Sequence, residues 1–395
     1  MTEYKLEELL KIKNGRDYKH LNQGNIPVYG SGGLMRYVDE SLYEGKSILL
    51  PRKGTLSNIQ YVNELFWTVD TIYYSIVDES KADPYYLYNY IKLLDLSHLN
   101  TGTGVPSMTF GAYYDVPIKL PSLNIQKQIA KVLSDLDAKI EINNKINQEL
   151  EAMAKTLYDY WFVQFDFPDK NGKSYKSSGG KMVFNEELKR EIPEGWEVKT
   201  IDKMANRVCV GFVGKCQPYF CSQTEGIPLI RTGNLSLAGL DMNNLVYVNN
   251  EFHNKNLKSQ LRSGDILVAR HGDSGLSSIY YKKEPANCLN VVVVKPEDNT
   301  VYSSEFLYQT LNTKHIVKQI KSTSGGSVQG VVNTKSIADV KLAVPLNKNI
   351  QRALDKSIIP IYKRIHNNKD ENQKLSELRD WLLPMLMNGQ VTMQE

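Results

Sequence analysis

The chain has few of the residues that build disulfide frameworks and metal sites. Its 395 residues include four Cys and six His. Three of the Cys fall within Cys209–Cys221, at spacings that match neither a disulfide framework nor a usual zinc site, and no His pair has a metal-ligand spacing. We therefore expect reduced, mostly buried thiols and no metal.

Long apolar runs and a strong charge of one sign are also missing. No stretch has the length of a membrane span and no secretory signal is recognisable, so a soluble protein of the cytoplasm without a membrane partner is expected. The formal net charge of +4 is too small to indicate nucleic acid by itself. The length predicts two or three domains with a sizeable core.

The motifs of common catalytic sites are missing as well. Gly211-x-x-Gly214-Lys215-Cys216 is too short for a phosphate loop and lacks its hydroxyl. There is no nucleophile elbow, no amino-methyltransferase motif and no plausible nuclease carboxylate cluster. A lone hydrolase that uses His271 and Asp273 is an improbable alternative. We expect no catalytic residue, so any catalysis would come from partners.

Gly and Pro do not occur in residues 124–161, and this stretch carries a helical repeat. Apolar residues and two Asn alternate in steps of four and three, which is the 3.5-residue spacing of a coiled-coil seam. The seam consists of Ile129, Leu133, Leu136, Ile140, Asn143, Asn147, Leu150, Ala154, Leu157 and Trp161. The repeat predicts a long helix over residues 122–163.

The same pattern returns in residues 346–395, which predicts a second long helix and a tail. Its seam consists of Leu354, Ile358, Ile361, Ile365, Asn368, Asn372, Leu375, Arg379, Leu382 and Leu386. Asn124 and Asn349 are the expected N-caps, and Asn388-Gly389 is the expected C-terminal stop. Because Arg379 places a charge on the seam, that end is expected to fray or to contact something else.

The Asn residues predict how the two helices meet. In an antiparallel pair, Asn143 would face Asn372. Asn147 would then face Asn368, and these buried amides would specify register and direction at some cost in stability. The alternative is that each Asn lies at the edge of an ordinary amphipathic helix. Because the pattern occurs in both copies, we favour the paired seam.

Two strand-rich segments precede the helices and resemble each other in outline. Residues 1–121 and 195–345 each contain a strand that runs into a glycine loop, a buried strand that ends in a basic loop, and a later glycine-rich loop. Residues 164–194 are expected to form a linker and the entry to the second half. The predicted fold is α+β, with two mixed globular domains joined by two long antiparallel helices in a pseudo-twofold arrangement.

Glycine beside hydrogen-bond donors marks the loops of both domains as candidate DNA contacts. Glycine lets the backbone approach closely, Arg and Lys suit guanine edges or phosphates, and Asn and Gln suit adenine. The candidates in the first domain are Ser31, Arg52, Lys53, Thr55, Asn58, Asn100, Thr101 and Thr103. Those in the second are Lys215, Arg231, Thr232, Asn234, Arg270, His271, Asp273, Ser274, Ser327 and Gln329. A single loop of this kind is usually an ordinary turn, but its repetition in both halves favours a function.

Several short segments together carry a family resemblance. They are Ile26–Gly33, Leu49–Gly54, Phe66–Asp70, Leu120–Gln126, Tyr160–Asp166, Gly180–Phe184, Ile192–Trp196 and Gly226–Leu235. With them the chain resembles the specificity (S) subunit of type I restriction–modification systems. It departs from that pattern at Gln164, where Asp is common, and at Asn124, where an acidic residue is frequent.

The resemblance implies two target recognition domains, each reading one half of a bipartite sequence in double-stranded DNA, with the helices as a spacer. It implies two methyltransferase subunits that modify adenine with S-adenosylmethionine, and motor–nuclease subunits that use ATP and magnesium in a bacterial or archaeal cytoplasm. The S subunit would bind none of these cofactors itself. The alternative is a coiled-coil scaffold with two adaptor domains and no sequence-specific DNA binding.

Overall fold

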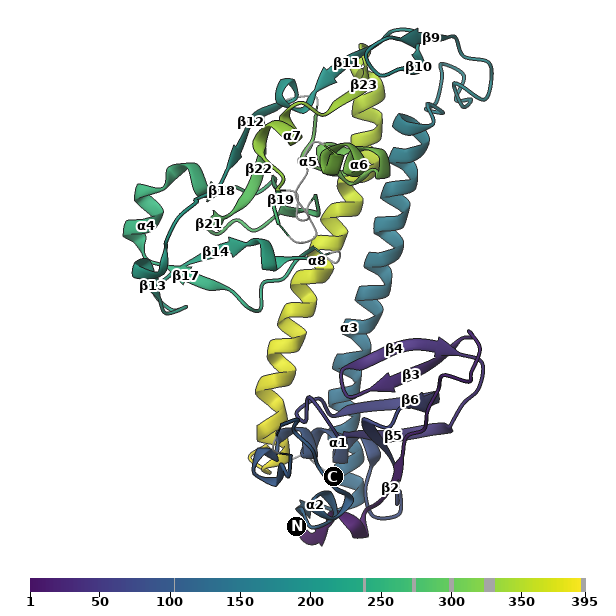
Figure 1. Cartoon of the computed structure of the whole chain (residues 1–395), viewed down its shortest axis with the longest axis vertical. Coiled ribbons are helices and arrows are strands. Elements are labelled where there is room, and N and C mark those ends of the chain that lie inside the picture. Colours follow the sequence, from purple (N-terminus) through teal and green to yellow (C-terminus); the bar gives the residue numbers. More distant parts are fainter. Residues whose placement is uncertain (103, 237–238, 272–274, 298–301, 323–330, 392–395) are drawn as a thin grey trace. The chain divides into compact units, whose positions relative to one another are not determined.

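The chain folds into two compact units, and each unit contains part of both long helices. The computed structural model describes residues 1–102, 104–236, 239–271, 275–297, 302–322 and 331–391. One unit is Met1–Asn143 with Asp370–Glu395, and the other is Asn144–Lys369. The boundary falls inside both α3 (Leu123–Tyr158) and α8 (Lys348–Met387), so each unit holds a globular head and part of each helix (Figure 1). We call residues 1–122 the first head and residues 164–347 the second head.

A six-stranded sheet forms the centre of the first head. Its order is β2-β7-β5-β6-β3-β4, with bounds Leu10–Asn14 (β2), Ile72–Val77 (β7), Tyr43–Pro51 (β5), Gln60–Thr68 (β6), Ile26–Gly30 (β3) and Gly33–Val38 (β4). A separate ribbon pairs β1 (Thr2–Lys5) with β8 (Pro117–Leu120). Leu50 of the sheet shares a core with Tyr86 of α1 (Pro84–Leu93) and Leu133 of α3.

The first head's main helix begins where the sequence supplies both usual start signals. The Asp83 carboxylate accepts hydrogen bonds from the backbone N–H groups of Tyr85 and Tyr86, and Pro84 occupies the first turn, where its missing N–H costs nothing. Gln126 of α3 binds this start, because its Oε1 accepts from Asp83 N at 3.0 Å. The head is therefore attached to α3 through a buried polar contact as well as through its apolar core.

The second head divides the corresponding strands between two sheets. The first sheet is β12-β22-β19-β20 and the second is β13-β17-β14-β21-β18. Their bounds are Ala205–Val210 (β12), Val291–Pro296 (β22), Asp265–Ala269 (β19), Ser277–Tyr280 (β20), Phe220–Cys221 (β13), Val246–Val248 (β17), Ile227–Arg231 (β14), Ala286–Leu289 (β21) and Gln260–Leu261 (β18). The head also contains short ribbons and helices: β9 (Met182–Asn185) with β10 (Arg190–Pro193), β11 (Trp196–Thr200) with β23 (Lys341–Pro345), β15 (Leu235–Ser236) with β16 (Gly239–Leu240), α4 (Asn250–Lys255), α5 (Ser304–Asn312), α6 (Lys314–Ser322) and α7 (Thr334–Ala338).

The two heads share one strand plan, as the repeated loops predicted. In the first head β7 lies between β2 and β5, and in the second β22 lies between β12 and β19, all antiparallel. β3 pairs in parallel with β6, and β14 pairs in parallel with β21. Single hydrogen bonds also repeat: Leu6 N donates to Val116 O at 3.0 Å, and Ile201 N donates to Val340 O at the same distance. The duplication therefore extends from the helices to both heads.

The ends of the long helices differ in one respect from the sequence prediction. Asn124 and Asn349 do not cap them, because α3 begins at Leu123 and α8 at Lys348. At α8 the capping oxygen belongs to Asn347, whose Oδ1 accepts from Asn349 N at 3.1 Å. The C-terminal stop was predicted correctly, since Gly389 has φ 69° directly after α8 ends at Met387.

The first part of the second head packs tightly. Phe165 and Phe167 are 1 % and 4 % exposed and both contact Trp196. Phe165 has φ 67°, a left-handed conformation that is costly for a bulky residue. The Arg190 guanidinium lies 4.6 Å from its ring centroid. The surrounding aromatic contacts hold this backbone in place.

Two expectations about the whole chain can be compared with the structure. All four Cys are free thiols, and Cys209, Cys216 and Cys288 are buried, as the sequence predicted. Within the described ranges, no helix combines the length and the apolar character that a membrane span needs.

Candidate nucleic-acid interface

The candidate loops of the first head lie together. Asn58 Nδ2 in the loop after β5 donates to Ser31 O at 2.8 Å, in the loop after β3. Met108 N, just before the short helix α2 (Phe110–Tyr114), donates to Arg52 O at 2.9 Å. Three loops that are far apart in the sequence therefore meet at one end of the sheet.

Arg52 is held in place but remains half exposed. Its backbone N donates to Thr71 O at 2.9 Å, and its guanidinium carbon lies 5.9 Å from the ring centroid of Tyr73. Burial raises the pKa of Tyr73 and the nearby Arg52 charge lowers it. The Tyr73 hydroxyl stays neutral near pH 7 and donates to Met108 O at 3.2 Å. Its Nη1 also donates to Asp70 O at 3.4 Å. A cation that is held in place and half exposed suits contact with a phosphate or with guanine.

The other first-head candidates divide into exposed donors and loop-shaping groups. Lys53 and Thr55 are exposed. Asn100 Oδ1 accepts from Gly102 N and Ser107 N, both at 2.9 Å. Thr101 Oγ1 donates to Ser107 O at 3.2 Å, and Thr103 lies outside the described residues. Asn100 and Thr101 therefore help to set the loop's shape, and a base contact by either stays a prediction.

The second head repeats the arrangement around Arg270, which follows β19 as Arg52 follows β5. Val332 N donates to Arg270 O at 3.1 Å, just before α7, and Arg270 Nε donates to Val332 O at 3.2 Å. His271 is exposed. The remaining candidates in these two loops, Asp273, Ser274, Ser327 and Gln329, lie outside the described part of the chain.

Asn234 performs a structural task in the second head. Its side chain is 3 % exposed, Oδ1 accepts from Arg231 N at 3.0 Å, and Nδ2 donates to the carbonyl groups of Asp241 and Asn244, both at 3.3 Å. Because the oxygen and the nitrogen of its side-chain amide are both hydrogen-bonded within the loop, Asn234 shapes the turn that presents Arg231 and Thr232.

Those two neighbours and Lys215 remain accessible to different degrees. Arg231 and Thr232 are half-buried and Lys215 is exposed. Thr232 Oγ1 donates to Asn290 O at 3.1 Å, which ties this loop to the end of β21. Contact of these three side chains with DNA stays a prediction.

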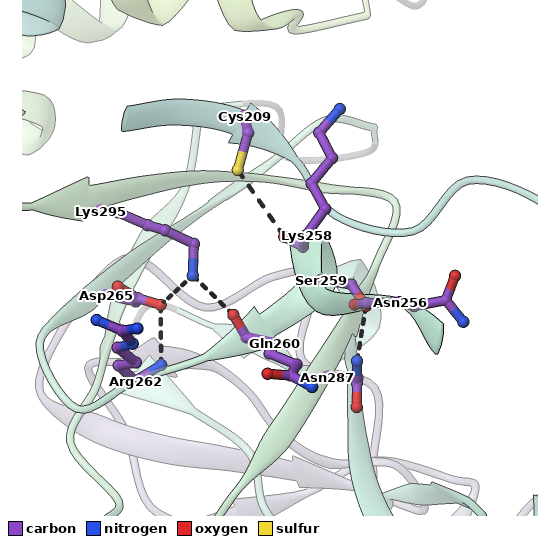
Figure 2. A network of polar contacts seen from close by, with 9 residues as sticks. All are labelled: Cys209, Asn256, Lys258, Ser259, Gln260, Arg262, Asp265, Asn287 and Lys295. Atoms are coloured by element: carbon purple, nitrogen blue, oxygen red, sulfur yellow. Dashed lines mark hydrogen bonds and ion pairs between the residues drawn. The ribbon is translucent and has the colours of Figure 1, made fainter. Parts of the chain in front are cut away.

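A buried ion pair supports β19, the strand that precedes Arg270. Figure 2 shows Lys295 of β22 reaching Asp265 at the start of β19, with Nζ 2.9 Å from Oδ2, and Nζ also donates to Gln260 O at 2.7 Å. The same carboxylate oxygen accepts from Arg262 N at 2.9 Å. The two side chains are 19 % and 5 % exposed, so removal of one partner would leave a charge without compensation. The network was not apparent from the sequence, because its partners are far apart along the chain.

The predicted Asn contacts are present in each unit. In the first unit, Asn143 Nδ2 donates to Asn372 Oδ1 at 2.8 Å. In the second, Asn368 Nδ2 donates to Asn147 Oδ1 at 2.8 Å. Asn143, Asn147 and Asn368 are 0 %, 5 % and 2 % exposed, so they do not lie at the edge of an ordinary amphipathic helix. The predicted antiparallel register of α3 and α8 is confirmed.

The two Asn–Asn contacts form polar layers in the seam. These polar layers contain one hydrogen-bond partner that the sequence did not suggest and two polar atoms without a hydrogen bond. Asn143 Nδ2 also donates to Glu371 Oε2 at 2.7 Å. Asn143 Oδ1 and Asn147 Nδ2 are buried without a hydrogen-bond partner. Such groups reduce stability. Their presence is consistent with a seam that retains polar residues for specific pairing.

Arg379, the charged seam position, contacts the other helix and does not fray. Its Nη1 lies 2.7 Å from Asp137 Oδ1, and the Tyr85 hydroxyl donates to the second oxygen of the same carboxylate. α8 continues to Met387. The sequence placed the charge correctly but did not identify its partner, because Asp137 lies beside the seam and belongs to no repeat.

A family model described as the type I restriction modification DNA specificity domain matches residues 1–152 and 193–378. The chain belongs to this specificity family. One relative, the type I restriction enzyme HindI specificity subunit of Haemophilus influenzae, is 25 % identical, with 76 % of this chain and 74 % of the relative covered. The MjaIX specificity subunit of Methanocaldococcus jannaschii is also 25 % identical, with 93 % and 84 % covered.

A solved structure supports the fold of this specificity-family member. The crystal structure of the type I restriction–modification S subunit from M. genitalium has a TM-score of 0.64 at 16 % identity, covering 100 % of this chain and 96 % of that one. At this identity the likeness speaks for the fold alone. The names of the relatives do not favour the alternative of a scaffold without sequence-specific DNA binding.

Proposed function

We propose that the chain is the DNA-reading specificity subunit of a type I restriction–modification system. Each head reads one half of a bipartite target, and the helices set the distance between the halves. Two methyltransferase subunits modify adenine with S-adenosylmethionine, and motor–nuclease subunits cleave unmodified DNA with ATP and magnesium. The chain itself contributes no catalytic residue and acts in the cytoplasm, where the DNA is.

The observation that carries this proposal is one loop frame used twice with different side chains. The backbone pairing of Arg52 with Met108 corresponds to that of Arg270 with Val332. After the shared Arg, the first head continues with Lys53 and the second with His271. Base recognition depends on side chains at groove edges, whereas a common backbone frame positions them. Two loops with the same backbone arrangement and different side chains are suited to reading two different half-sites.

The polar layers supply the second requirement, a defined separation. An apolar seam alone would tolerate a slip by a heptad, whereas buried Asn–Asn contacts penalise it, because a slipped amide would face an apolar residue. A defined register gives the two heads a defined spacing. A bipartite DNA target needs such spacing, since its two halves lie a set number of base pairs apart.

The test is to co-express the chain with the methyltransferase subunit of its own system and to map adenine methylation across a host genome. The proposal predicts one motif made of two different specified halves separated by unspecified bases. A continuous palindrome or the absence of any motif, despite an active methyltransferase, would reject it. A methyltransferase subunit expressed without the chain is the control and should leave no motif.

A further inference from the structure

A row of exposed cations follows one edge of the first head's sheet. Lys11 and Lys13 lie on β2, and Arg16 and Lys19 follow it; all four side chains are exposed. Within the described residues, none of the four takes part in an ion pair. Three other exposed lysines of this head do: Lys5 with Asp115, Lys46 with Glu79 and Lys119 with Glu3, at 2.9, 2.8 and 3.9 Å. We call the four unpaired residues the basic strip.

The basic strip adjoins the loop cluster. Asn14, the last residue of β2, is paired with Tyr73, the ring below the Arg52 guanidinium. Beyond the strand, Arg16 N donates to Thr68 O at 2.8 Å. Thr71 O, between these two points, accepts from Arg52 N at 2.9 Å. Arg16 of the strip therefore lies at the same turn, before β7, to which the candidate base-reading loop is attached.

The geometry of β2 suits a row of phosphates. Leu10 and Ile12 point into the core, so Lys11 and Lys13 share the opposite face, about 7 Å apart along the strand. Lysines on an edge strand can also serve only to prevent sheet-to-sheet association. That explanation does not extend to Arg16, which lies beyond the strand and is bonded through its backbone to Thr68.

The second head retains only part of this feature, because the position that matches Lys11 is Arg207, which is exposed and paired with Lys295. Lys13 is paired with Tyr74, and in the matching strands Cys209 is paired with Val293. Cys209 is 3 % exposed, and its Sγ lies 4.0 Å from Lys258 O. The segment from Lys258 to Leu261 thus covers Cys209 in the second head, whereas the matching residue of the first head, Lys13, is open to solvent (Figure 2).

We propose that the basic strip binds the DNA backbone beside the half-site read by the first head. This inference rests on the proposed function. Unpaired cations at the end of a loop cluster gain from releasing counterions from DNA, and phosphate contacts position a protein without selecting sequence. The strip therefore adds affinity and salt dependence on the first head's side of the target.

The test compares a triple variant, Lys11→Ala with Lys13→Ala and Arg16→Ala, with a charge-matched control. The control is Lys5→Ala with Lys46→Ala and Lys119→Ala, which removes three cations that already have carboxylate partners. Binding of the full-length proteins to a random-sequence duplex is measured by fluorescence anisotropy between about 50 and 200 mM salt. Circular dichroism and thermal melting establish that all variants are folded.

The strip variant should reduce the slope of log affinity against log salt by about 2.7, since each phosphate contact contributes about 0.9. The control should change it by less than about one contact. Equal slopes for the wild type and the strip variant would contradict the proposed DNA contact of the basic strip, without contradicting DNA binding by the protein. If the wild type had no salt-dependent affinity for DNA, both the proposed function and the proposed DNA contact of the strip would be rejected. The methylation motif written by the strip variant should be unchanged, and a changed motif would contradict a backbone contact.

Discussion

A buried amide pair tolerates the loss of both partners better than the loss of one. Asn147 and Asn368 illustrate this, because each is almost completely buried and their one hydrogen bond joins the two helices. Replacement of one by Leu removes the bond and leaves the other amide unsatisfied, whereas replacement of both gives an ordinary apolar layer.

We therefore expect Asn368→Leu to lower the free energy of unfolding by about 1–3 kcal/mol, and the double variant with Asn147→Leu to recover most of the loss. Urea unfolding of the four proteins in this double-mutant cycle measures the coupling. Gln148→Leu, at an exposed position of α3, is the control and should change little. Additive losses in the double variant would mean that the layer does not act as a pair.

Asp355 is a half-buried carboxylate of α8 that accepts hydrogen bonds from Ser303 and Gln351. Burial raises its pKa from 3.8 to about 6, although Ser303 Oγ donates to its Oδ1 at 2.6 Å. A group with a raised pKa in the folded state favours folding while it is protonated, below about pH 4. That contribution is lost as the pH rises to about 6 and the carboxylate ionises.

Asp355→Asn should therefore remove one source of pH dependence. We expect it to raise the free energy of unfolding at pH 7 by about 1–2 kcal/mol, less than the full pKa shift implies, because water reaches part of the carboxylate. At pH 4 the variant and the wild type should be nearly equal. Chemical denaturation at both values checks this, and a variant that is less stable at pH 7 would contradict it.

At the scale of elements, the helices could be predicted and the loops only in part. The 3.5-residue repeat relates each seam residue to its partner, so Asn143 with Asn372 followed from spacing alone. Helix starts were misplaced by one or two residues, because Ser122 and Asn347 offer the same capping chemistry just before the helices begin. Seam spacing is a property of the sequence, whereas the choice among neighbouring caps depends on the entering chain.

The role of a loop amide could not be predicted because it depends on burial. Asn234 has the composition of a base reader, but folding directs both of its polar groups into its own loop. Likewise β6 is continuous, whereas its counterpart is divided into β20 and β21. No local pattern distinguishes these cases, since both depend on contacts between segments far apart in the chain.

The proposed role of α3 and α8 in setting the distance between the half-sites can be tested by lengthening both helices. Insertion of four residues into both α3 and α8, beside the Asn layers, lengthens each helix by about 6 Å while the same residues remain opposite each other. We expect the methylated motif to keep both halves and to gain bases in its unspecified spacer, or the activity to be lost. Methylation mapping distinguishes these results, and an active enzyme with an unchanged spacer would contradict the helices' role in spacing.

At the scale of the whole molecule, duplication followed by divergence explains the distribution of similarity. The helices retain matching seams because each must fit the other. The heads retain strand order and loop frame, but in the second a segment covers Cys209, and the residues after Arg52 and Arg270 differ. The proposed reading of two different half-sites would change the loops while the frame that holds them is preserved.

The most direct measurement of this relation is a methylation map after exchange of one head. Residues 1–121 are replaced by the equivalent segment of a relative with a different target, and the hybrid is expressed with the methyltransferase subunits. We predict that one half of the motif changes to the donor's half, while the other half and the spacer length stay as they were. A hybrid that is active and changes both halves, or neither, would contradict the division of recognition between two independent heads.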